Sequence, residues 1–419
     1  MEKALLVTIE FKQDKETLNI EDSAVELEEL SSACKLETLD SITCICHKPT
    51  PNFLIGRGKV EEIGVLAQEL DINAIILSRN LSGTQQRNLE EVWGKKTIDR
   101  TQLILDIFAR RAKSPEGKMQ VELAQLEYLT PRLTGKGVIL SRQGGGVGTS
   151  GPGEKKLEVG RRKIRERINR LRKDLEGVSR HRALIRKKRK NEAILLIALV
   201  GYTSAGKSTL LNALTEAGQF VSENMFATLD PLARSVKLPS GARAVFSDTV
   251  GFLRDLPHNL IDAFKATLEE VTAADLLIHV LDASSPQVHD KSRAVMEVLR
   301  ELNADNKPMI TALNKIDLLP DQMWLKTLIS DFVNPVTISA KLKVNLDLLI
   351  QKIESAMPDR MVEVNITIPH QRMDLIDLFY RQGRVEDIRY LQKGIKVKAR
   401  LPSLLHKKIL SDKDILANC

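Results

Sequence analysis

The chain has 419 residues, of which 42% are hydrophobic and 28% charged, and a formal net charge of +8. This length corresponds to about three domains, and the apolar runs are too short to span a bilayer. Because the start also lacks the long apolar core and cleavage site of a signal peptide, we expect neither a membrane span nor secretion, but a cytoplasmic monomer.

The first 113 residues are predicted to form a small α/β domain. Short apolar strands alternate there with helical stretches such as residues 59–70. The run Gly56-Arg57-Gly58 lacks the third glycine of a dinucleotide-binding fingerprint, so we interpret it as a strand-to-helix turn. The predicted strands cover residues 5–9, 42–46, 73–77 and 97–99.

Residues 114–190 are predicted to form an antiparallel helical hairpin whose second helix is strongly basic. Between Glu154 and Lys190 there are 17 Lys and Arg but only 5 Asp and Glu, so the rest of the chain is net negative. Narrow apolar stripes in both halves are typical of a two-helix seam. The stripe residues are Leu123, Leu126, Leu129 and Leu133 in the first helix and Leu157, Ile164, Ile168, Leu171 and Leu175 in the second.

The turn of this hairpin is rich in glycine. Eight of the nineteen residues between Gly135 and Gly153 are glycine, and none is acidic. By composition alone, a flexible linker fits this segment. Because two long helices present it beside many basic residues, we favour contact with a narrow, phosphate-lined crevice of folded RNA, with the basic helix as a second RNA-binding segment.

An apolar strand over residues 194–200 leads directly into a glycine-rich loop that ends in Lys-Ser. In such a loop backbone N–H groups point at phosphates, the lysine adds a charge, the serine binds Mg²⁺, and the following helix contributes its positive dipole end. We assign a catalytic role to Lys207 and a Mg²⁺ ligand to Ser208. The predicted phosphate-binding residues are Gly201, Tyr202, Thr203, Ser204, Ala205, Gly206, Lys207, Ser208 and Thr209.

Two further segments are predicted to sense the third phosphate. After the strand at 244–247, Asp248 would hold Mg²⁺ through water and the N–H of Gly251 would contact the γ-phosphate. Upstream, Thr228 is the candidate hydroxyl for Mg²⁺ and the γ-phosphate, in a loop ordered by GTP. Thr228 and Gly251 are therefore assigned catalytic roles. The predicted nucleotide contacts here are Phe226, Ala227, Thr228, Asp248, Thr249, Val250 and Gly251.

The base is indicated by residues that follow two later strands. Asn314, Lys315 and Asp317 come after the strand at 309–313 and are placed at the carboxyl edge of a parallel sheet. A carboxylate there accepts hydrogen bonds from N1–H and the amine of guanine, and adenine would leave it unpaired, a discrimination of roughly 10⁴. The run Ser339-Ala340-Lys341, which follows the predicted strand at 336–338, fits a backbone contact to the guanine oxygen. We therefore predict GTP or GDP with Mg²⁺, and not ATP.

Phe252 follows Gly251 at a position where many such GTPases carry a glutamine that orients the attacking water. A phenylalanine can neither donate nor accept a hydrogen bond, so we expect slow basal hydrolysis that a partner raises by roughly 10³ to 10⁵. Arg254 is interpreted as a solvated loop residue rather than as an arginine finger acting in cis.

The fold class that these patterns predict is α/β. Residues 191–360 would form a P-loop GTPase domain with a mostly parallel sheet and helices on both faces. The small α/β domain and the hairpin precede it. Residues 361–419 would form a small α+β domain, in which no chemistry is evident.

Taken together, these motifs resemble the HflX family of ribosome-associated GTPases over nearly the whole chain. The specific stretches are residues 52–60, 98–102 and above all 135–154, and residues 226–231 and 248–252 resemble that family's switch segments. The resemblance implies GTP-dependent binding to the large ribosomal subunit, with the glycine loop directed toward the peptidyl transferase region. It further implies splitting of stalled or stressed ribosomes and GTP hydrolysis stimulated by ribosomal particles.

Two other functions stay open at this point. One is a ribosome-assembly GTPase that acts on immature ribosomal RNA, and the other is an RNA-remodelling protein that nucleotide only regulates. Separation of ribosomal subunits, binding of precursors and unwinding of duplex RNA without ribosomes distinguish the three.

Overall fold

The computed structural model describes residues 2–13, 20–132, 152–191, 194–215, 232–254, 265–319, 322–356, 361–392, 394–402, 409 and 416–417. The chain divides into two compact units, the first containing the residues up to Val178 and the second most of the remainder. None of the helices in these ranges combines the length and the apolar character that crossing a membrane requires.

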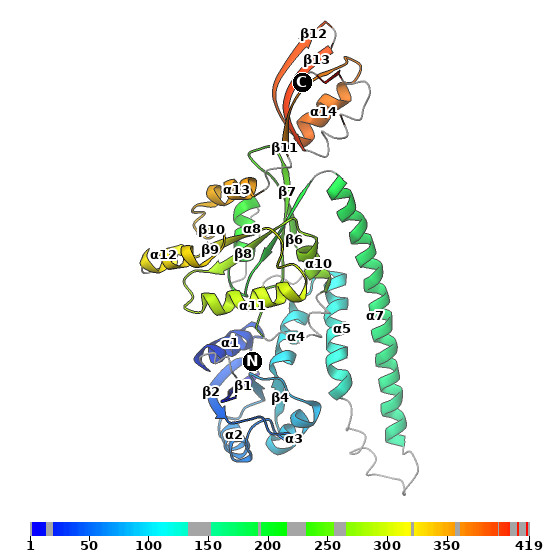
Figure 1. Ribbon diagram of the computed structural model, residues 1–419. Coiled ribbons are helices and arrows are strands. Elements are labelled where there is room, and N and C mark those ends of the chain that lie inside the picture. The colour runs from blue at the N-terminus through cyan, green and yellow to red at the C-terminus, as the bar shows by residue number, and fades with distance from the viewer. Residues whose placement is uncertain are drawn as a thin grey trace. The chain divides into compact units, whose positions relative to one another are not determined.

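The first unit is built on a four-stranded parallel sheet with the strand order β2-β1-β3-β4 (Figure 1). The two central strands are almost continuously apolar and buried, as expected for strands covered by helices on both faces. This arrangement confirms the predicted α/β class. The strands are β1 (Lys3–Phe11), β2 (Glu37–Cys46), β3 (Ala74–Leu77) and β4 (Lys96–Asp99), and the helices are α1 (Ile20–Ala33), α2 (Arg57–Glu69), α3 (Gly83–Trp93) and α4 (Arg100–Arg111).

The hairpin consists of α5 (Pro115–Arg132) and α7 (Pro152–Asn191), which run side by side in opposite directions (Figure 1). Leu123, Ile168 and Leu171 form the buried centre of the seam. Met119, Leu126, Ile164 and Leu175 pack around them. Leu129 was predicted to belong to the seam but is 43% exposed, so that part of the prediction is wrong. Leu133 and the glycine-rich turn lie outside the described residues.

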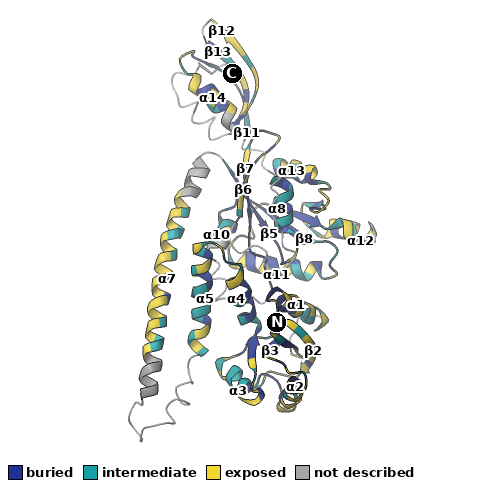
Figure 2. Ribbon diagram, turned by 180° about the vertical axis from the view of Figure 1, so that it is seen from behind, coloured by how far each residue is buried: buried dark blue, intermediate teal, exposed yellow. Residues whose placement is uncertain are grey.

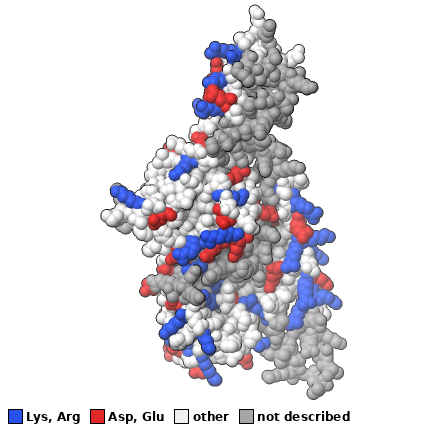
Figure 3. Space-filling model, viewed as in Figure 1, with Lys and Arg blue, Asp and Glu red and all other residues white. Residues whose placement is uncertain are grey.

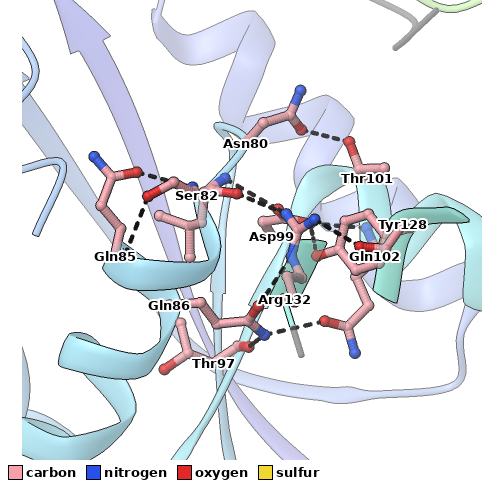
Figure 4. A network of polar contacts seen from close by, with 11 residues as sticks. Asn80, Ser82, Gln85, Gln86, Thr97, Asp99, Thr101, Gln102, Tyr128 and Arg132 are labelled. Carbon is pink, nitrogen blue, oxygen red and sulfur yellow. Dashed lines mark hydrogen bonds and ion pairs between the residues drawn. The ribbon is translucent and has the colours of Figure 1, made fainter. Parts of the chain in front are cut away.

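The C-terminal end of α5 is fixed to the N-terminal sheet by a polar network centred on Asp99 (Figure 4). One carboxylate oxygen accepts hydrogen bonds from the backbone N–H of Gln102 and from the Tyr128 hydroxyl, both at 2.8 Å. The other accepts from the N–H of Leu81 at 3.0 Å and from Arg132 Nη2 at 2.8 Å. The Asp99 side chain is fully buried. One cation and three neutral donors therefore compensate this carboxylate.

We expect Asp99→Asn to lower the free energy of unfolding of the first unit by about 3–5 kcal/mol, because the Arg132 guanidinium loses its buried counter-charge. Tyr128→Phe removes a single hydrogen bond and should lower it by only about 1 kcal/mol. Hydrogen exchange of the α4 and α5 amides, measured across a denaturant series, separates the two variants. Equal losses would show that the ion pair does not dominate the network.

The second unit contains a six-stranded sheet with the order β10-β9-β8-β5-β7-β6, in which only the β6–β7 pair is antiparallel. Its strands are β5 (Leu195–Val200), β6 (Leu232–Lys237), β7 (Arg243–Asp248), β8 (Leu276–Asp282), β9 (Met309–Asn314) and β10 (Pro335–Thr337). Its helices are α8 (Lys207–Thr215), α10 (Lys265–Ala273), α11 (Val288–Glu301), α12 (Gln322–Asp331) and α13 (Leu346–Ser355), with a 3₁₀ turn η1 (Ile316–Leu318).

Successive residues of these strands supply two different cores, because side chains alternate between the faces of a sheet. On one face of the sheet, Ile278 of β8 belongs to a core that also contains Leu210 of α8 and Leu349 of α13. On the other face, Leu281 of β8 packs with Val288 of α11. The central strands of these two sheets are buried, whereas the edge strand β2 and the helix α7 are mostly exposed (Figure 2). Helices therefore cover both faces of the mostly parallel sheet, as predicted.

The described C-terminal residues include a small antiparallel sheet with the order β12-β13-β11-β14 and the helix α14. Val364, Ile366 and Val397 face Phe379 of the helix in a separate core. This confirms the predicted α+β character. The elements are β11 (Met361–Ile368), α14 (Met373–Gln382), β12 (Arg384–Leu391), β13 (Gly394–Pro402) and β14 (Leu416–Ala417).

Candidate functional site

The loop between β5 and α8 is shaped by two glycines. A Cβ at Gly201 would lie 2.3 Å from the carbonyl oxygen of Val280, so any side chain would collide with β8. Gly206 has φ +94°, and a Cβ there would lie 2.3 Å from the side-chain amide of Asn314. Only glycine fits both places without strain. The spacing of these two residues therefore reflects a steric requirement of the loop.

Lys207 lies inside this loop and binds its backbone. Its ammonium donates to the carbonyl oxygens of Gly201 at 2.9 Å and Tyr202 at 2.8 Å. The residue is buried, and burial lowers the pKa of Lys207 to about 8, against the opposing effect of the Asp248 carboxylate. The loop thus holds its cation in a place where an incoming phosphate group can take over from the two carbonyls.

This pKa gives nucleotide binding a pH dependence of definite sign. Phosphates favour the protonated ammonium, so they raise the pKa of Lys207 above its value in the empty protein. Above pH about 8, binding must therefore take up a proton, and affinity should fall by up to about tenfold per pH unit. Below that pH, Lys207 is protonated in both states and no proton is exchanged.

Titration calorimetry with GDP, in buffers of different ionisation enthalpy one unit below and just above this pKa, measures the proton uptake directly. An affinity and a proton count that stay constant across the two conditions would contradict the predicted uptake of a proton by Lys207 on phosphate binding.

Ser208 and Asp248 form a pair of oxygen donors beside Lys207. The Ser208 hydroxyl donates to Oδ2 of Asp248 at 2.6 Å, and Asp248, the last residue of β7, is buried. Hydroxyl and carboxylate oxygens are the ligands that Mg²⁺ prefers. These two predicted ligands therefore fit the ion. The third, Thr228, lies with Phe226 and Ala227 outside the described residues.

The segment after β7 is joined to the phosphate loop by backbone hydrogen bonds. The N–H of Phe252 donates to the oxygen of Gly201 at 3.1 Å, and the N–H of Thr203 donates to the oxygen of Phe252 at 3.0 Å. A Cβ at Gly251 would lie 2.8 Å from Thr203 Cγ2, so only glycine allows this approach. Within the segment, the Thr249 hydroxyl donates to the oxygen of Leu199 at 2.7 Å, which fixes the chain behind the loop.

The residues predicted to read the base meet at the carboxyl edge of β9 and β10. Asn314 donates to the carbonyl of Ala205 at 2.9 Å and accepts from the N–H of Ala340 at 2.9 Å. Oδ1 of Asp317 accepts from the Ser339 hydroxyl at 2.6 Å. Asn314 was predicted as a base contact. In the structure it joins the phosphate loop to the run at 339–341, so it holds the two halves of the site together.

Two residues of the neighbouring strand β8 were missed by the sequence analysis. Asp282, the last residue of β8, forms an ion pair with Lys315, whose Nζ donates to Oδ2 at 2.7 Å. Lys315 itself has the left-handed φ of +63°. His279 is buried in β8, and its pKa is lowered to about 4 by burial and by the charge of Lys207. A polar residue inside an apolar strand, and a carboxylate at its end, were the available sequence signals.

Comparison with known proteins connects this geometry to a family. Three family models match successive parts of the chain: GTP-binding GTPase N-terminal over residues 21–109, GTP-binding GTPase Middle Region over 111–189, and 50S ribosome-binding GTPase over 196–315. A protein named GTPase HflX from Caldanaerobacter subterraneus is 46% identical over 401 residues, which cover 96% of this chain and 91% of that one.

GTPase HflX from Escherichia coli is 39% identical over 403 residues, covering 96% of this chain and 94% of that one. Among solved structures, a GTP-binding protein from the archaeon Sulfolobus solfataricus in complex with GDP is 26% identical, with a TM-score of 0.44 over 85% of this chain and 98% of that one.

Proposed function

This chain belongs to the HflX family of GTPases, and from that premise we propose that in its GTP state it binds the large ribosomal subunit and splits stalled or stressed ribosomes into subunits. The observation that carries the proposal is the match of residues 196–315 to a 50S ribosome-binding GTPase, because these residues hold the phosphate loop and Asp248. The basic helix at 154–190 in the same chain supports an RNA-containing partner. The proposed place of action is the cytoplasm.

In the proposed site, the backbone N–H groups of residues 201–209 surround the phosphates, and Lys207 shifts from its two carbonyls to the β- and γ-phosphates. Ser208 and Asp248 hold Mg²⁺ together with Thr228; the bound ion neutralises negative charge on these phosphates. Asp317 accepts hydrogen bonds from guanine, and the run at 339–341 contacts the guanine oxygen. The N–H of Gly251 contacts the γ-phosphate.

On the ribosome, we assign the contacts with large-subunit RNA to the glycine-rich segment 135–153 and to the basic helix 154–190. Occupation of the interface between the subunits drives them apart. GTP favours the binding state by ordering the segments around Thr228 and Gly251, because both then contact the γ-phosphate. Hydrolysis removes those contacts, lowers the affinity for the subunit and releases the protein as a monomer.

Sedimentation of intact ribosomes with the purified protein tests this function. With a non-hydrolysable GTP analogue we expect separated subunits, with the protein on the large one, and with GDP we expect intact ribosomes and free protein. Intact ribosomes in both nucleotide states would overturn splitting. Binding only to precursor particles would favour the assembly GTPase, and unwinding of duplex RNA without ribosomes would favour the remodelling protein.

A further inference from the structure

We propose that the outer face of α7, formed by Lys163, Arg170 and Lys173, binds phosphates of ribosomal RNA, whereas Arg167 and Arg172 on the same helix hold the hairpin together. This inference rests on the proposed function and deepens it, since it divides the basic helix into a binding face and a structural face.

The structural face is defined by ion pairs across the seam. Nε and Nη2 of Arg167 donate to the two carboxylate oxygens of Glu122, each at 2.7 Å. Nη2 of Arg172 donates to Glu127 at 2.8 Å. The Arg167 contact is bidentate, the geometry in which an arginine and a carboxylate bind most strongly, and it lowers the pKa of Glu122. These two arginines are already matched with acidic residues of α5.

The binding face lies on the other side of the helix. At about 100° per residue, Lys163, Arg170 and Lys173 lie opposite the seam residue Ile168, and all three are exposed. Within the part of the chain that the structure describes, none of the three has an ion-pair partner within 4.0 Å. Blue side chains follow α7 along the right-hand edge of Figure 3.

Two acidic residues also lie near this face, and they do not cancel its charge. Glu166 is 3.8 Å from Arg162 and so has a cation of its own. Asp174 adds one negative charge beside the three unpaired cations, so the face stays net positive. Along the helix, Lys163 and Lys173 are about 15 Å apart. A row of cations of this length suits the phosphates of one RNA strand, which carry one charge each and follow one another continuously.

RNA is favoured over a protein partner because the match to a 50S ribosome-binding GTPase names a particle rich in RNA, and because this stretch of the helix offers little apolar surface. Protein interfaces are centred on buried aromatic and aliphatic anchors. The exposed residues between Lys163 and Lys173 are polar or charged, and the apolar ones belong to the seam.

The test compares two full-length variants that each lose two positive charges from the same helix. Arg170→Gln/Lys173→Gln changes the outer face, and Arg167→Gln/Arg172→Gln changes the seam. Binding to purified large ribosomal subunits with a non-hydrolysable GTP analogue is measured across a salt series. For the outer pair we expect the slope of log K against log salt to fall by about 1.5–2, with a Kd raised roughly 10- to 100-fold at low salt.

For the seam pair we expect an unchanged slope and a lower melting temperature. Equal changes of slope in the two variants would overturn the proposal, because they would show a general charge effect without a binding face. An unchanged slope in the outer pair would overturn it as well. A third variant, Lys12→Gln/Lys48→Gln, removes two exposed charges outside the helix and should match the wild-type chain.

The same series on protein-free large-subunit RNA identifies the partner. Loss of affinity for both targets in the outer pair supports RNA, whereas loss for subunits alone would show that a ribosomal protein occupies this face and would overturn the proposal. If the wild-type chain does not bind large subunits at all, the proposed function fails, and the comparison of the pairs on free RNA still decides the role of the face.

Discussion

Replacing Asp317 by asparagine should change the preferred base from guanine to xanthine. GTP affinity should fall by about 10³ to 10⁴, because an amide donor would then face the N1–H and amine donors of guanine. Xanthine presents a carbonyl oxygen in place of that amine and can accept from the new amide. The substitution is expected to preserve the loop, since the amide oxygen of asparagine can still accept from the Ser339 hydroxyl that Asp317 binds at 2.6 Å.

Ser339→Ala is the matched control for this substitution. It removes the hydrogen bond that holds the Asp317 side chain but leaves the carboxylate in place, so GTP affinity should fall by less than about tenfold and the base preference should not change. Titration calorimetry of each variant with GTP, ATP and xanthosine triphosphate measures all three affinities directly. Unchanged GTP affinity in Asp317→Asn would remove this residue from the site.

The phosphate loop was readable from the sequence because its constraints are local. Gly201 and Gly206 are needed at fixed places within eight residues, and each collides with another strand if it is replaced. The strand before the loop and the helix after it were equally readable, since both show regular apolar patterns. For the six-stranded sheet, the sequence predicted that most strands are parallel, as a P-loop fold requires. It did not predict the order of the strands.

The contacts that connect distant segments were not readable. Asn314 forms hydrogen bonds with Ala205 and Ala340, which are distant from it in the sequence. Arg132 donates to Asp99, although α4 and α5 separate the two residues in the sequence. No local periodicity distinguishes such a partner from a solvated polar residue. For Leu129, the local pattern was clear but the prediction was wrong. This residue continues the apolar stripe of α5, yet it stays exposed, because burial depends on how the two helices pack.

Large ribosomal subunits should raise the turnover number for GTP by roughly 10³ to 10⁵, the range that a supplied catalytic group gives in related enzymes. The reason lies in Phe252, which stands where a water-orienting glutamine would otherwise be. Its side chain is only 2% exposed, and its backbone is held by hydrogen bonds to Gly201 and Thr203. The Phe252 side chain therefore supplies no hydrogen bond that could orient the attacking water, and it is packed in the core.

The same packing predicts that a glutamine will not repair the site. Phe252→Gln places an amide in an apolar position, so it should lower the free energy of unfolding by about 1–3 kcal/mol without raising the basal rate.

Arg254→Ala tests whether the nearby arginine acts in cis; a stimulated rate within about threefold of wild type would exclude that role. Phosphate release under multiple turnover, with and without saturating large subunits, measures each rate. Fast hydrolysis by the isolated chain that subunits do not change would contradict the prediction. It would show that residues of this chain orient the attacking water.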